Sequence, residues 1–384
     1  MSPRRAYGGR RYRRRRSPLP ALLLVIVLAA LVLGALAIFT DVFKKDKPAP
    51  APDDPVITQP DDGQQPDDGT DGQGGEDGQQ PDDTQQPDDT QQPTGNKTLD
   101  TITTDATPYQ SGGVYMVGDT GFEMYNYVDS LAKNYADIVT SVADQLAGVS
   151  TVYAMAVPLS SGITLPDALY SDIPGSDQAQ AEKDILAAMG NNVKTVPLHD
   201  TLMAHRGEYI YFRTDHHWTV TGAYYAYVAF CKEAGFTPTP YDSFEWNRKE
   251  PFYGTLYSQT QDSTLRENPD YVDYPTISTA HLAYMYKRGE PFTPYASTIM
   301  ADYASGVNMY SVFLHGDQPL TEIQTENKNG RKAVVVKESF GNAFSPFLVA
   351  HYETVYIVDQ RYFELNLLDF IKQSATVQYD EAMI

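Results

Sequence analysis

The most constraining stretch of the sequence is residues 209–235, where a pattern typical of a strand changes within a few residues to one typical of a helix. Residues 209–212 are an aromatic and β-branched run, which predicts a buried strand. From residue 220 apolar side chains recur at helical spacing, with Thr219 placed as N-cap and Gly235 just past the end. A strand leading into a helix is the unit of α/β proteins, so this stretch predicts that fold class.

A polar loop joins these two predicted elements. Within it, Asp215 and His217 are two residues apart, a spacing at which a carboxylate can orient an imidazole and stabilise its cation. In an open α/β sheet, catalytic groups collect just past the carboxyl ends of strands. His216 should turn the other way. The alternative is a histidine pair that caps the helix, with Trp218 in the core.

A second stretch supplies a nucleophile. Val334, Val335 and Val336 are the strongest signal for a central strand, and Ser339 stands just beyond them on a turn that contains Gly341. Several hydrolytic α/β folds expose a catalytic serine in this way, although most such serines are ordinary turn or cap residues. With His217 as base and Asp215 as its orienting group, the sequence predicts a Ser-His-Asp triad.

The other apolar runs continue the alternation of strands and helices, which predicts a three-layer domain with a mainly parallel central sheet. Expected strands cover residues 114–117, 152–157, 193–198 and 354–358, expected helices cover 124–146 and 178–189, and a hairpin is expected from 310–314 and 320–325. The helix over 124–146 should bury a stripe that includes Leu131 and Ile138. Residues 240–305 show no clear pattern.

The N-terminal part predicts export to the cell surface. Residues 1–18 contain eight arginines and should stay in the cytoplasm, while residues 19–40 are almost wholly apolar and long enough for a transmembrane signal-anchor. The competing prediction is a cleaved signal peptide, because Ala35-Leu36-Ala37 resembles a cleavage site. Either way the rest of the chain is placed outside the cytoplasm.

Residues 41–97 are rich in Pro, Asp and Gln and poor in apolar side chains, which predicts a disordered linker, although an acidic binding tail is the alternative. The folded domain is then residues 98–384. Residues 1–45 carry a net charge of +9 and residues 46–97 carry −12, so the chain's −21 leaves −18 for the domain. This charge disfavours nucleic acid as a partner. Cys231, the only cysteine, excludes an internal disulfide and is expected to be buried.

The motif at residues 214–219, Thr-Asp-His-His-Trp-Thr, resembles the signature of the DHHW protein family, and further similar blocks lie at residues 252–258, 310–317, 338–348 and 357–362. That family is similar to alginate O-acetylation proteins, which have a circularly permuted SGNH hydrolase-like domain. The resemblance implies that Asp215 and His217 match the Asp-x-His pair of those proteins and that Ser339 matches the nucleophile. The family usually has Asp-Ser-Tyr where this chain has Glu338-Ser339-Phe340.

The residues that would hold the oxyanion are less well defined. The backbone N–H of Ser339 or Phe340 is the first candidate by position, and Gly254 and the Asn342 side chain are weaker ones. Arg361 and Arg213 are candidates for binding an anionic or sugar substrate, or are structural ion-pair residues. Asp215, His216 and His217 are suitable metal ligands, but adjacent residues rarely bind one ion, so neither a metal nor a cofactor is expected.

The resulting hypothesis is a single-pass protein of the cell membrane, with a cytoplasmic N-terminus and an extracellular SGNH-like domain. It would act as an O-acetyltransferase or esterase on an exopolysaccharide or cell-wall glycan through an acyl-Ser339 intermediate. The resemblance also implies a multi-pass membrane acyltransferase as the acyl supplier. The alternative function is a non-catalytic glycan-binding or assembly protein on the same fold.

Overall fold

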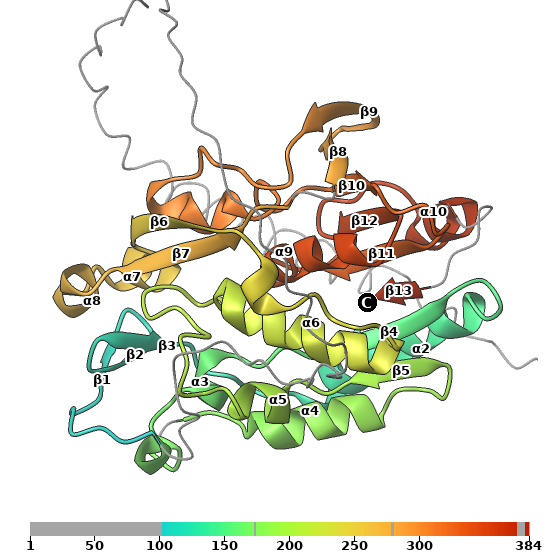
Figure 1. Cartoon of the computed structure of the whole chain (residues 1–384). Helices are drawn as coiled ribbons and strands as arrows, with labels where there is room; N and C mark the ends of the chain where they lie inside the picture. The colour runs from blue at the N-terminus through green and yellow to red at the C-terminus, as the bar shows by residue number, and fades with distance from the viewer. Residues whose placement is uncertain (1–101, 173, 278–279, 375–380, 384) are drawn as a thin grey trace, which may run out of the picture. The chain divides into compact units, whose positions relative to one another are not determined.

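The computed structural model describes residues 102–384, apart from residues 173, 278–279, 375–380 and 384 (Figure 1). All of them belong to the second of two units into which the chain divides, Thr84–Ile384. The predicted cytoplasmic segment 1–18, transmembrane segment 19–40 and linker 41–97 lie outside the described residues and stay predictions. Among the helices that are described, none combines the length and the apolar character needed to cross a membrane.

An eight-stranded mixed sheet forms the centre of the α/β fold. From one edge to the other its strands are β5 (Val193–Val196), β4 (Thr151–Met155), β13 (Glu381–Met383), β11 (Lys332–Lys337), β12 (Thr354–Asp359), β10 (Leu320–Thr325), β8 (Ala280–Lys287) and β9 (Glu290–Ser297). Neighbours from β5 to β12 are parallel, whereas β12, β10, β8 and β9 pair antiparallel. The expected mainly parallel sheet is therefore only half correct, because the unassigned region of the sequence supplies the antiparallel pair β8 and β9.

Strand β11 has the central position that its sequence predicts. Ala333 and Val334 are fully buried, and the strand pairs with β12 on one side and with β13 on the other. The C-terminal segment β13 fills the space between β11 and β4, a pairing that the sequence pattern did not reveal. The carboxyl end of β11 leads directly to Ser339.

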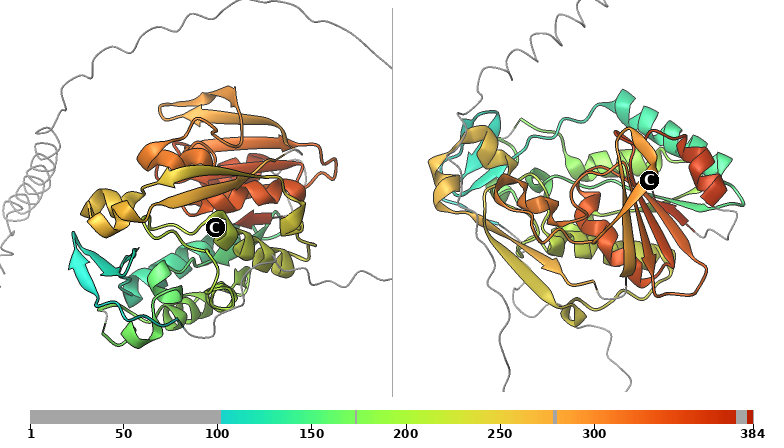
Figure 2. Two further views of the ribbon diagram at one scale, coloured as in Figure 1. Left: turned by 60° about the vertical axis from the view of Figure 1, so that its left-hand side comes forward. Right: turned by 90° about the horizontal axis from the view of Figure 1, so that it is seen from above.

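Helices cover both faces of this sheet (Figure 2). On one face α2 (Asp129–Gln145) and α10 (Leu367–Ser374) share an apolar cluster with the sheet through Val139 and Ile371. On the other face α6 (Val220–Ala234), α9 (Gly341–Phe344) and the 3-10 helix η4 (Ser345–Ala350) pack into a larger cluster with Val335. Cys231 on α6 is buried, as predicted.

The remaining helices are α3 (Ser160–Ile163), α4 (Gln178–Ala187), α5 (His199–Met203), α7 (Thr255–Thr260) and α8 (Ser263–Glu267), with 3-10 helices η1 (Asp167–Leu169), η2 (Tyr241–Ser243) and η3 (Gly306–Val312). Two small antiparallel sheets complete the fold: β1 (Tyr109–Ser111), β2 (Val114–Val117) and β3 (Thr120–Phe122) form one, and β6 (Trp246–Phe252) and β7 (Asp270–Pro275) form the other. In Figure 1 both lie on the left, next to α7.

One expectation about local structure is only partly correct and another is wrong. On α2 the expected Leu146 is buried and Tyr135 and Val142 pack against the same cluster, but Leu131 and Ile138 are 66% and 55% exposed, and the buried helix face includes Ala136, Val139 and Ala143. The alanines permit a close approach of the helix to the sheet. Residues 310–314 do not form a hairpin strand, because their first part belongs to the 3-10 helix η3.

Candidate active site

The polar loop that contains Asp215 and His217 does not leave a strand of the sheet, which corrects the expectation for residues 209–212. The chain instead folds back on itself: the N–H of Phe212 donates to the carbonyl of His217 at 3.2 Å, and the N–H of Thr219 donates to Ile210 at 2.9 Å. Thr219 also caps α6 as predicted, and Gly235 ends that helix with a φ of 76°. The backbone of residues 210–212 is satisfied within this narrow loop rather than by a neighbouring strand.

Asp215, His217 and Ser339 form a continuous chain of hydrogen bonds. His217 Nδ1 is 2.6 Å from Asp215 Oδ1, and His217 Nε2 is 2.7 Å from Ser339 Oγ. With Nδ1 donating to the carboxylate, Nε2 is left as the acceptor for the serine hydroxyl. Burial of Asp215 opposes its ionisation, but the hydrogen bond and charge of His217 outweigh this and hold the pKa of the Asp215 carboxyl below its ordinary value. The predicted contacts among the three residues are confirmed.

The carboxylate of Asp215 is fixed from its other side by α7. Its Oδ2 accepts hydrogen bonds from the Thr255 N–H at 2.8 Å and from the Thr255 hydroxyl at 3.0 Å. The preceding Gly254 has no room for a side chain, since a Cβ atom there would lie 2.2 Å from the Asp215 Cβ. The Gly254 N–H donates to the Thr214 hydroxyl at 3.0 Å, so this glycine makes space for Asp215 and is not available as an oxyanion donor.

Asp270, at the start of β7, anchors the same loop and was not identified from the sequence. Its fully buried carboxylate accepts from the Thr214 N–H at 2.6 Å, the Thr214 hydroxyl at 2.7 Å and the Arg213 N–H at 3.0 Å. The Tyr209 hydroxyl donates to it at 2.6 Å. Arg213 is thereby an ion-pair residue, bound to Asp270 and to Asp119, rather than a free substrate ligand.

The His217 ring is held by a tyrosine that the sequence had suggested was part of a strand. Tyr310 stacks on His217 with ring centroids 3.9 Å apart and planes 7° apart, and its hydroxyl donates to the Ser339 carbonyl at 3.1 Å. Burial, with the nearby Glu338 and Asp215 carboxylates, raises the pKa of Tyr310 well above its ordinary value, so the hydroxyl stays a donor. Trp218 Nε1 donates to the Phe340 carbonyl at 2.9 Å. The loop and the serine turn are therefore tied to each other.

Among the oxyanion candidates, the N–H of Phe340 shares a contact with the Ser339 hydroxyl, because both lie next to the Glu338 carboxylate. It lies 3.2 Å from both carboxylate oxygens of the exposed Glu338, one of which is 3.3 Å from Ser339 Oγ. Asn342 is buried and its amide donates to Asp317 at 2.9 Å. Arg361 pairs with Asp317 and Asp359. The side chains of Asn342 and Arg361 are therefore engaged by partners within the protein.

The ligand atoms of Asp215, His216 and His217 lie within 4.8 Å of one another, the cluster considered above for a metal ion. Both carboxylate oxygens of Asp215 and both ring nitrogens of His217 already have hydrogen-bond partners. His216 Nδ1 contacts the Thr255 hydroxyl at 2.5 Å, but the ring does not turn away from the site as expected: it packs beside the His217 ring, with centroids 3.8 Å apart. These pairings suit a triad better than a metal site.

A crevice of about 280 Å³ opens beside the serine turn, at the carboxyl ends of β4, β11 and β12. It is mostly apolar, and its lining includes Trp218, Val336, Phe344, Glu338 and Arg361. Ligand sites in α/β folds form at this edge of the sheet. Trp218 and Glu338, the sequence neighbours of His217 and Ser339, line this crevice, whereas Asp215, His217 and Ser339 themselves do not.

His216 is expected to make the fold sensitive to acid. Burial and the charge of His217 lower the pKa of His216 to about 4, so between this value and its ordinary 6.5 the unfolded chain binds a proton that the folded chain does not. The free energy of unfolding should then fall between pH 7 and pH 5. Urea unfolding at both values should show a smaller fall for His216→Ala than for the wild type. Equal falls would show that His216 titrates normally.

Comparison with known proteins places the chain in a family. A family model described as "DHHW protein" matches residues 82–358. A DHHW family protein from Eubacterium siraeum DSM 15702 is 32% identical, over 72% of this chain and 92% of that chain, with a TM-score of 0.66. Bacillus cereus PatB1 with a sulfonyl adduct is 17% identical, over 73% of this chain and 94% of that chain, with a TM-score of 0.57.

The O-acetyltransferase domain of Pseudomonas putida AlgJ overlaps more weakly, with 15% identity over 72% of this chain and 91% of that chain and a TM-score of 0.38. No curated protein matches the sequence. The family model spans most of the described domain and includes the Asp215, His217 and Ser339 segments. The chain belongs to the DHHW protein family.

Proposed function

We propose that this protein is an SGNH-like serine enzyme that carries an acyl group, most simply acetyl, to or from a glycan hydroxyl. The observation that carries the proposal is the hydrogen-bonded series Asp215–His217–Ser339, in which each side chain has the partner that its role requires. A serine hydroxyl is a weak nucleophile without a nearby base, and here the base is 2.7 Å away.

In the first half-reaction Ser339 Oγ attacks the acyl carbonyl carbon while His217 Nε2 takes the hydroxyl proton. Asp215 stabilises the imidazolium that forms. The developing oxyanion accepts from the Phe340 N–H, in the place that the Glu338 carboxylate occupies in the free enzyme. His217 then gives its proton to the leaving group, and the acyl group stays on Ser339.

In the second half-reaction His217 takes a proton from a sugar hydroxyl, or from water in an esterase, and that oxygen attacks the acyl-Ser339 carbonyl carbon. Ser339 leaves as the alkoxide and recovers the proton from His217. The cycle consumes one acyl donor and one acceptor and needs no metal or cofactor. A multi-pass membrane acyltransferase is the partner that would deliver the acyl group.

Labelling with a serine-directed phosphonate tests this function on the purified full-length protein. Mass spectrometry should find the adduct on Ser339, and a chromogenic acetyl ester should release acetate with the same dependence on that residue. Ser345→Ala, a change of the same kind in the next helix, is the matched control and should keep labelling. A sulfonyl reagent is a second probe, because the similar Bacillus cereus PatB1 was solved with a sulfonyl adduct.

If the wild type binds glycan but takes no label and releases no acetate, the protein is the non-catalytic glycan-binding or assembly protein instead. Labelling of another residue with Ser339 unmodified would also end the proposal. These outcomes separate an enzyme from a binding module on the same fold.

The proposed location is the outer face of the cell membrane, with residues 1–18 in the cytoplasm and residues 19–40 as the anchor. Protease added to intact cells should then cut within residues 41–97 and release the folded domain to the medium. Immunoblotting of cells and medium measures this. Full protection of the domain until the cells are lysed would reverse the orientation.

A further inference from the structure

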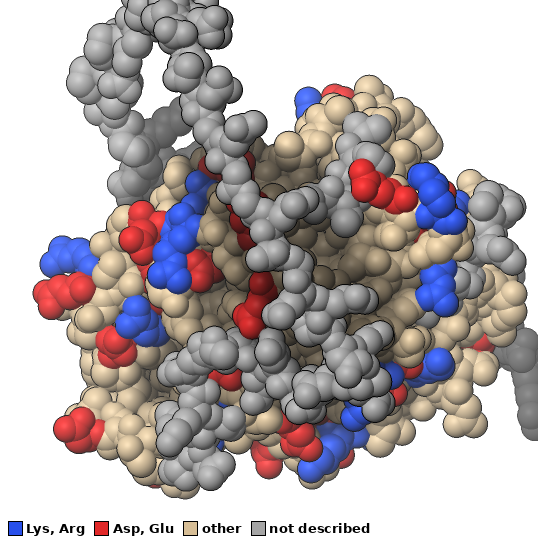
Figure 3. All heavy atoms as spheres, viewed as in Figure 1, with Lys and Arg blue, Asp and Glu red and all other residues tan. Residues whose placement is uncertain are grey.

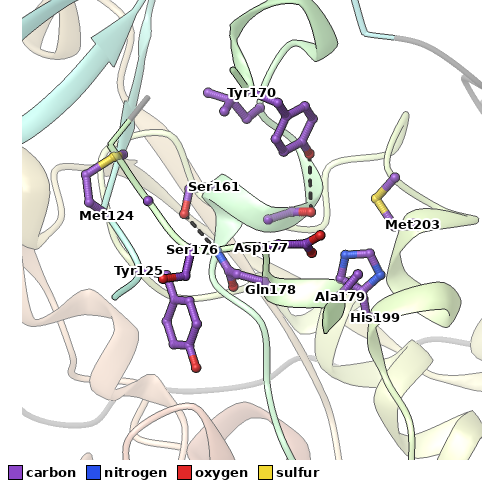
Figure 4. A pocket seen from close by; sticks show the side chains of 13 residues that line it. Met124, Tyr125, Ser161, Tyr170, Ser176, Asp177, Gln178, Ala179, His199 and Met203 are labelled. Atoms are coloured by element: carbon purple, nitrogen blue, oxygen red, sulfur yellow. Dashed lines mark hydrogen bonds between the residues drawn. The ribbon is translucent and has the colours of Figure 1, made fainter. Parts of the chain in front are cut away.

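A second cavity, of about 400 Å³, lies at the start of α4 (Figure 4). Figure 4 shows Met124 and Tyr125 on one side, His199 and Met203 on the other, and Asp177 and Gln178 between them. This volume lies in the range of small-ligand sites, and apolar or aromatic walls with a few polar groups are their usual composition. No role in the triad chemistry accounts for the cavity.

The walls of this cavity are fixed by internal contacts. Gln178 accepts from the Leu159 N–H at 2.8 Å and donates to Ser161 Oγ at 3.0 Å. Gly162 lies so close to Gln178 that a Cβ atom would approach it to 2.6 Å. The Tyr170 hydroxyl donates to the Gly162 carbonyl at 3.2 Å, while the residue as a whole is 41% exposed. An aromatic ring held in place yet open to solvent can stack on the face of a sugar.

A short segment links this cavity to the serine centre. Strand β3 is tied to the catalytic loop by the Gly121 N–H, which donates to the Arg213 carbonyl at 3.0 Å. The chain then passes Glu123 and reaches Met124 and Tyr125 in the cavity wall. Glu123 is exposed as a residue, yet its carboxyl group is desolvated enough to raise its pKa, and the charges of His217 and Asp215 also influence it. Glu123 therefore lies in the short segment that joins β3, which contacts the catalytic loop, to the cavity wall.

The charge along this path is acidic. Asp177 caps α4 by accepting from the Gln180 N–H at 3.0 Å, and among the described residues that line the cavity none is Lys or Arg. Glu123 and Glu338 add carboxylates near the triad. Figure 3 shows acidic side chains along the hollow near the centre of the view and basic ones mostly around it. Anionic sugars such as uronates would meet repulsion here.

The basic side chains near Ser339 do not offset this charge. Lys337 is bound by Asp317 at 2.9 Å and by Asp359 at 3.5 Å, and Arg361 shares both of these partners. Two cations and two carboxylates in one cluster cancel each other. Beside the cavity, the buried Arg206 donates to the Leu165 carbonyl and is paired with Asp167 at 2.6 Å. The carboxylates of Glu123, Glu338 and Asp177 thus set the sign of the field that an acceptor meets.

We propose that the cavity at the start of α4 is a saccharide subsite, reached from the serine centre past Glu123, and that it takes uncharged or cationic sugar units. This rests on the proposed function only for the reaction at Ser339. A glycan bound in the subsite would stack on Tyr170 and place a neighbouring sugar hydroxyl toward Ser339. Asp177 would hold an amino group or a hydroxyl of the bound unit.

Calorimetric titration of the full-length protein with tetrasaccharides of glucosamine, N-acetylglucosamine and galacturonic acid tests this subsite. At low salt the glucosamine oligomer should bind about tenfold or more tightly than the galacturonate oligomer. Asp177→Asn keeps the helix cap but removes the charge, and should weaken glucosamine binding about fivefold with little change for the neutral oligomer. Tyr170→Ala should weaken both about fivefold through loss of stacking.

Asp184→Asn is the matched control for Asp177→Asn, because it removes the same charge from an exposed position on α4. Tyr303→Ala is the matched control for Tyr170→Ala, because it removes an exposed tyrosine outside the cavity lining. Both controls should bind the oligomers as the wild type does. The circular dichroism spectra and urea unfolding midpoints of Asp177→Asn and Tyr170→Ala should match those of the wild type, which shows that both variants fold. Tighter binding of galacturonate, or equal effects of Asp177→Asn and Asp184→Asn, would overturn the subsite. If the wild type takes no phosphonate label but its glycan binding still depends on Asp177 and Tyr170, the proposed enzyme activity is overturned and the subsite is not.

Discussion

Replacing Asp215 with Asn is expected to lower kcat for acetyl-ester hydrolysis by about 10⁴-fold while the protein stays folded. The carboxylate accepts from His217 Nδ1, from the His217 N–H at 3.0 Å and from the Thr255 N–H at 2.8 Å. Asn has the same shape but only one acceptor oxygen. If its amide group faces His217, Nδ1 must become the acceptor and Nε2 then carries the proton.

With that proton on Nε2, His217 can no longer accept the Ser339 hydroxyl proton. The rate constant for phosphonate labelling should therefore fall with kcat, while circular dichroism and the unfolding midpoint change little. Asp273→Asn makes the same substitution in a carboxylate that pairs with Arg248, and should keep the wild-type rate. His216→Ala should also keep most of it, because the His216 ring packs beside His217 but forms its hydrogen bond with Thr255 and not with Ser339. A loss of less than tenfold in Asp215→Asn would remove Asp215 from the proposed triad.

The features that could be predicted from the sequence are those set by neighbouring residues. Thr219 and Gly235 cap α6, and the valines of β11 lead to Ser339, because capping and burial patterns act over a few positions. The Asp215–His217 contact is equally local. These signals, together with the resemblance to the DHHW family, assigned the three residues that the structure brings together.

The features that could not be predicted from the sequence depend on pairing between segments in the folded structure. Residues 209–212 have the composition of a strand, but they pair with residues 217–219 of their own loop. The C-terminal strand β13 has a place between β4 and β11 that no local pattern specifies. Tyr310 and Asp270 are far from the triad in sequence, and neither has a neighbouring residue that indicates its contact.

Asp270→Ala is expected to lower the free energy of unfolding by about 3–5 kcal/mol, the usual cost of removing one partner from a buried charged cluster. The carboxylate is fully buried, and its removal leaves the Arg213 and Thr214 N–H groups and the Thr214 and Tyr209 hydroxyls without their acceptor. Unpaired buried donors are costly. Because these donors position the loop just before Asp215, activity should fall as well as stability.

Asp273→Ala is the matched control for this prediction, since it lies on the same strand and loses a bidentate pair with the half-exposed Arg248. Exposed pairs of this kind contribute about 1 kcal/mol or less. Urea unfolding of the wild type, Asp270→Ala and Asp273→Ala at pH 7 measures stability. Measuring kcat at urea concentrations below each unfolding transition separates the effect on activity from the effect on stability. If Asp270→Ala loses no more stability than Asp273→Ala, or stays fully active, the loop is held by the Thr219 cap and the Tyr310 stack without Asp270. A large loss in both measurements would make Asp270 the residue that couples the folding of β7 to the placement of Asp215.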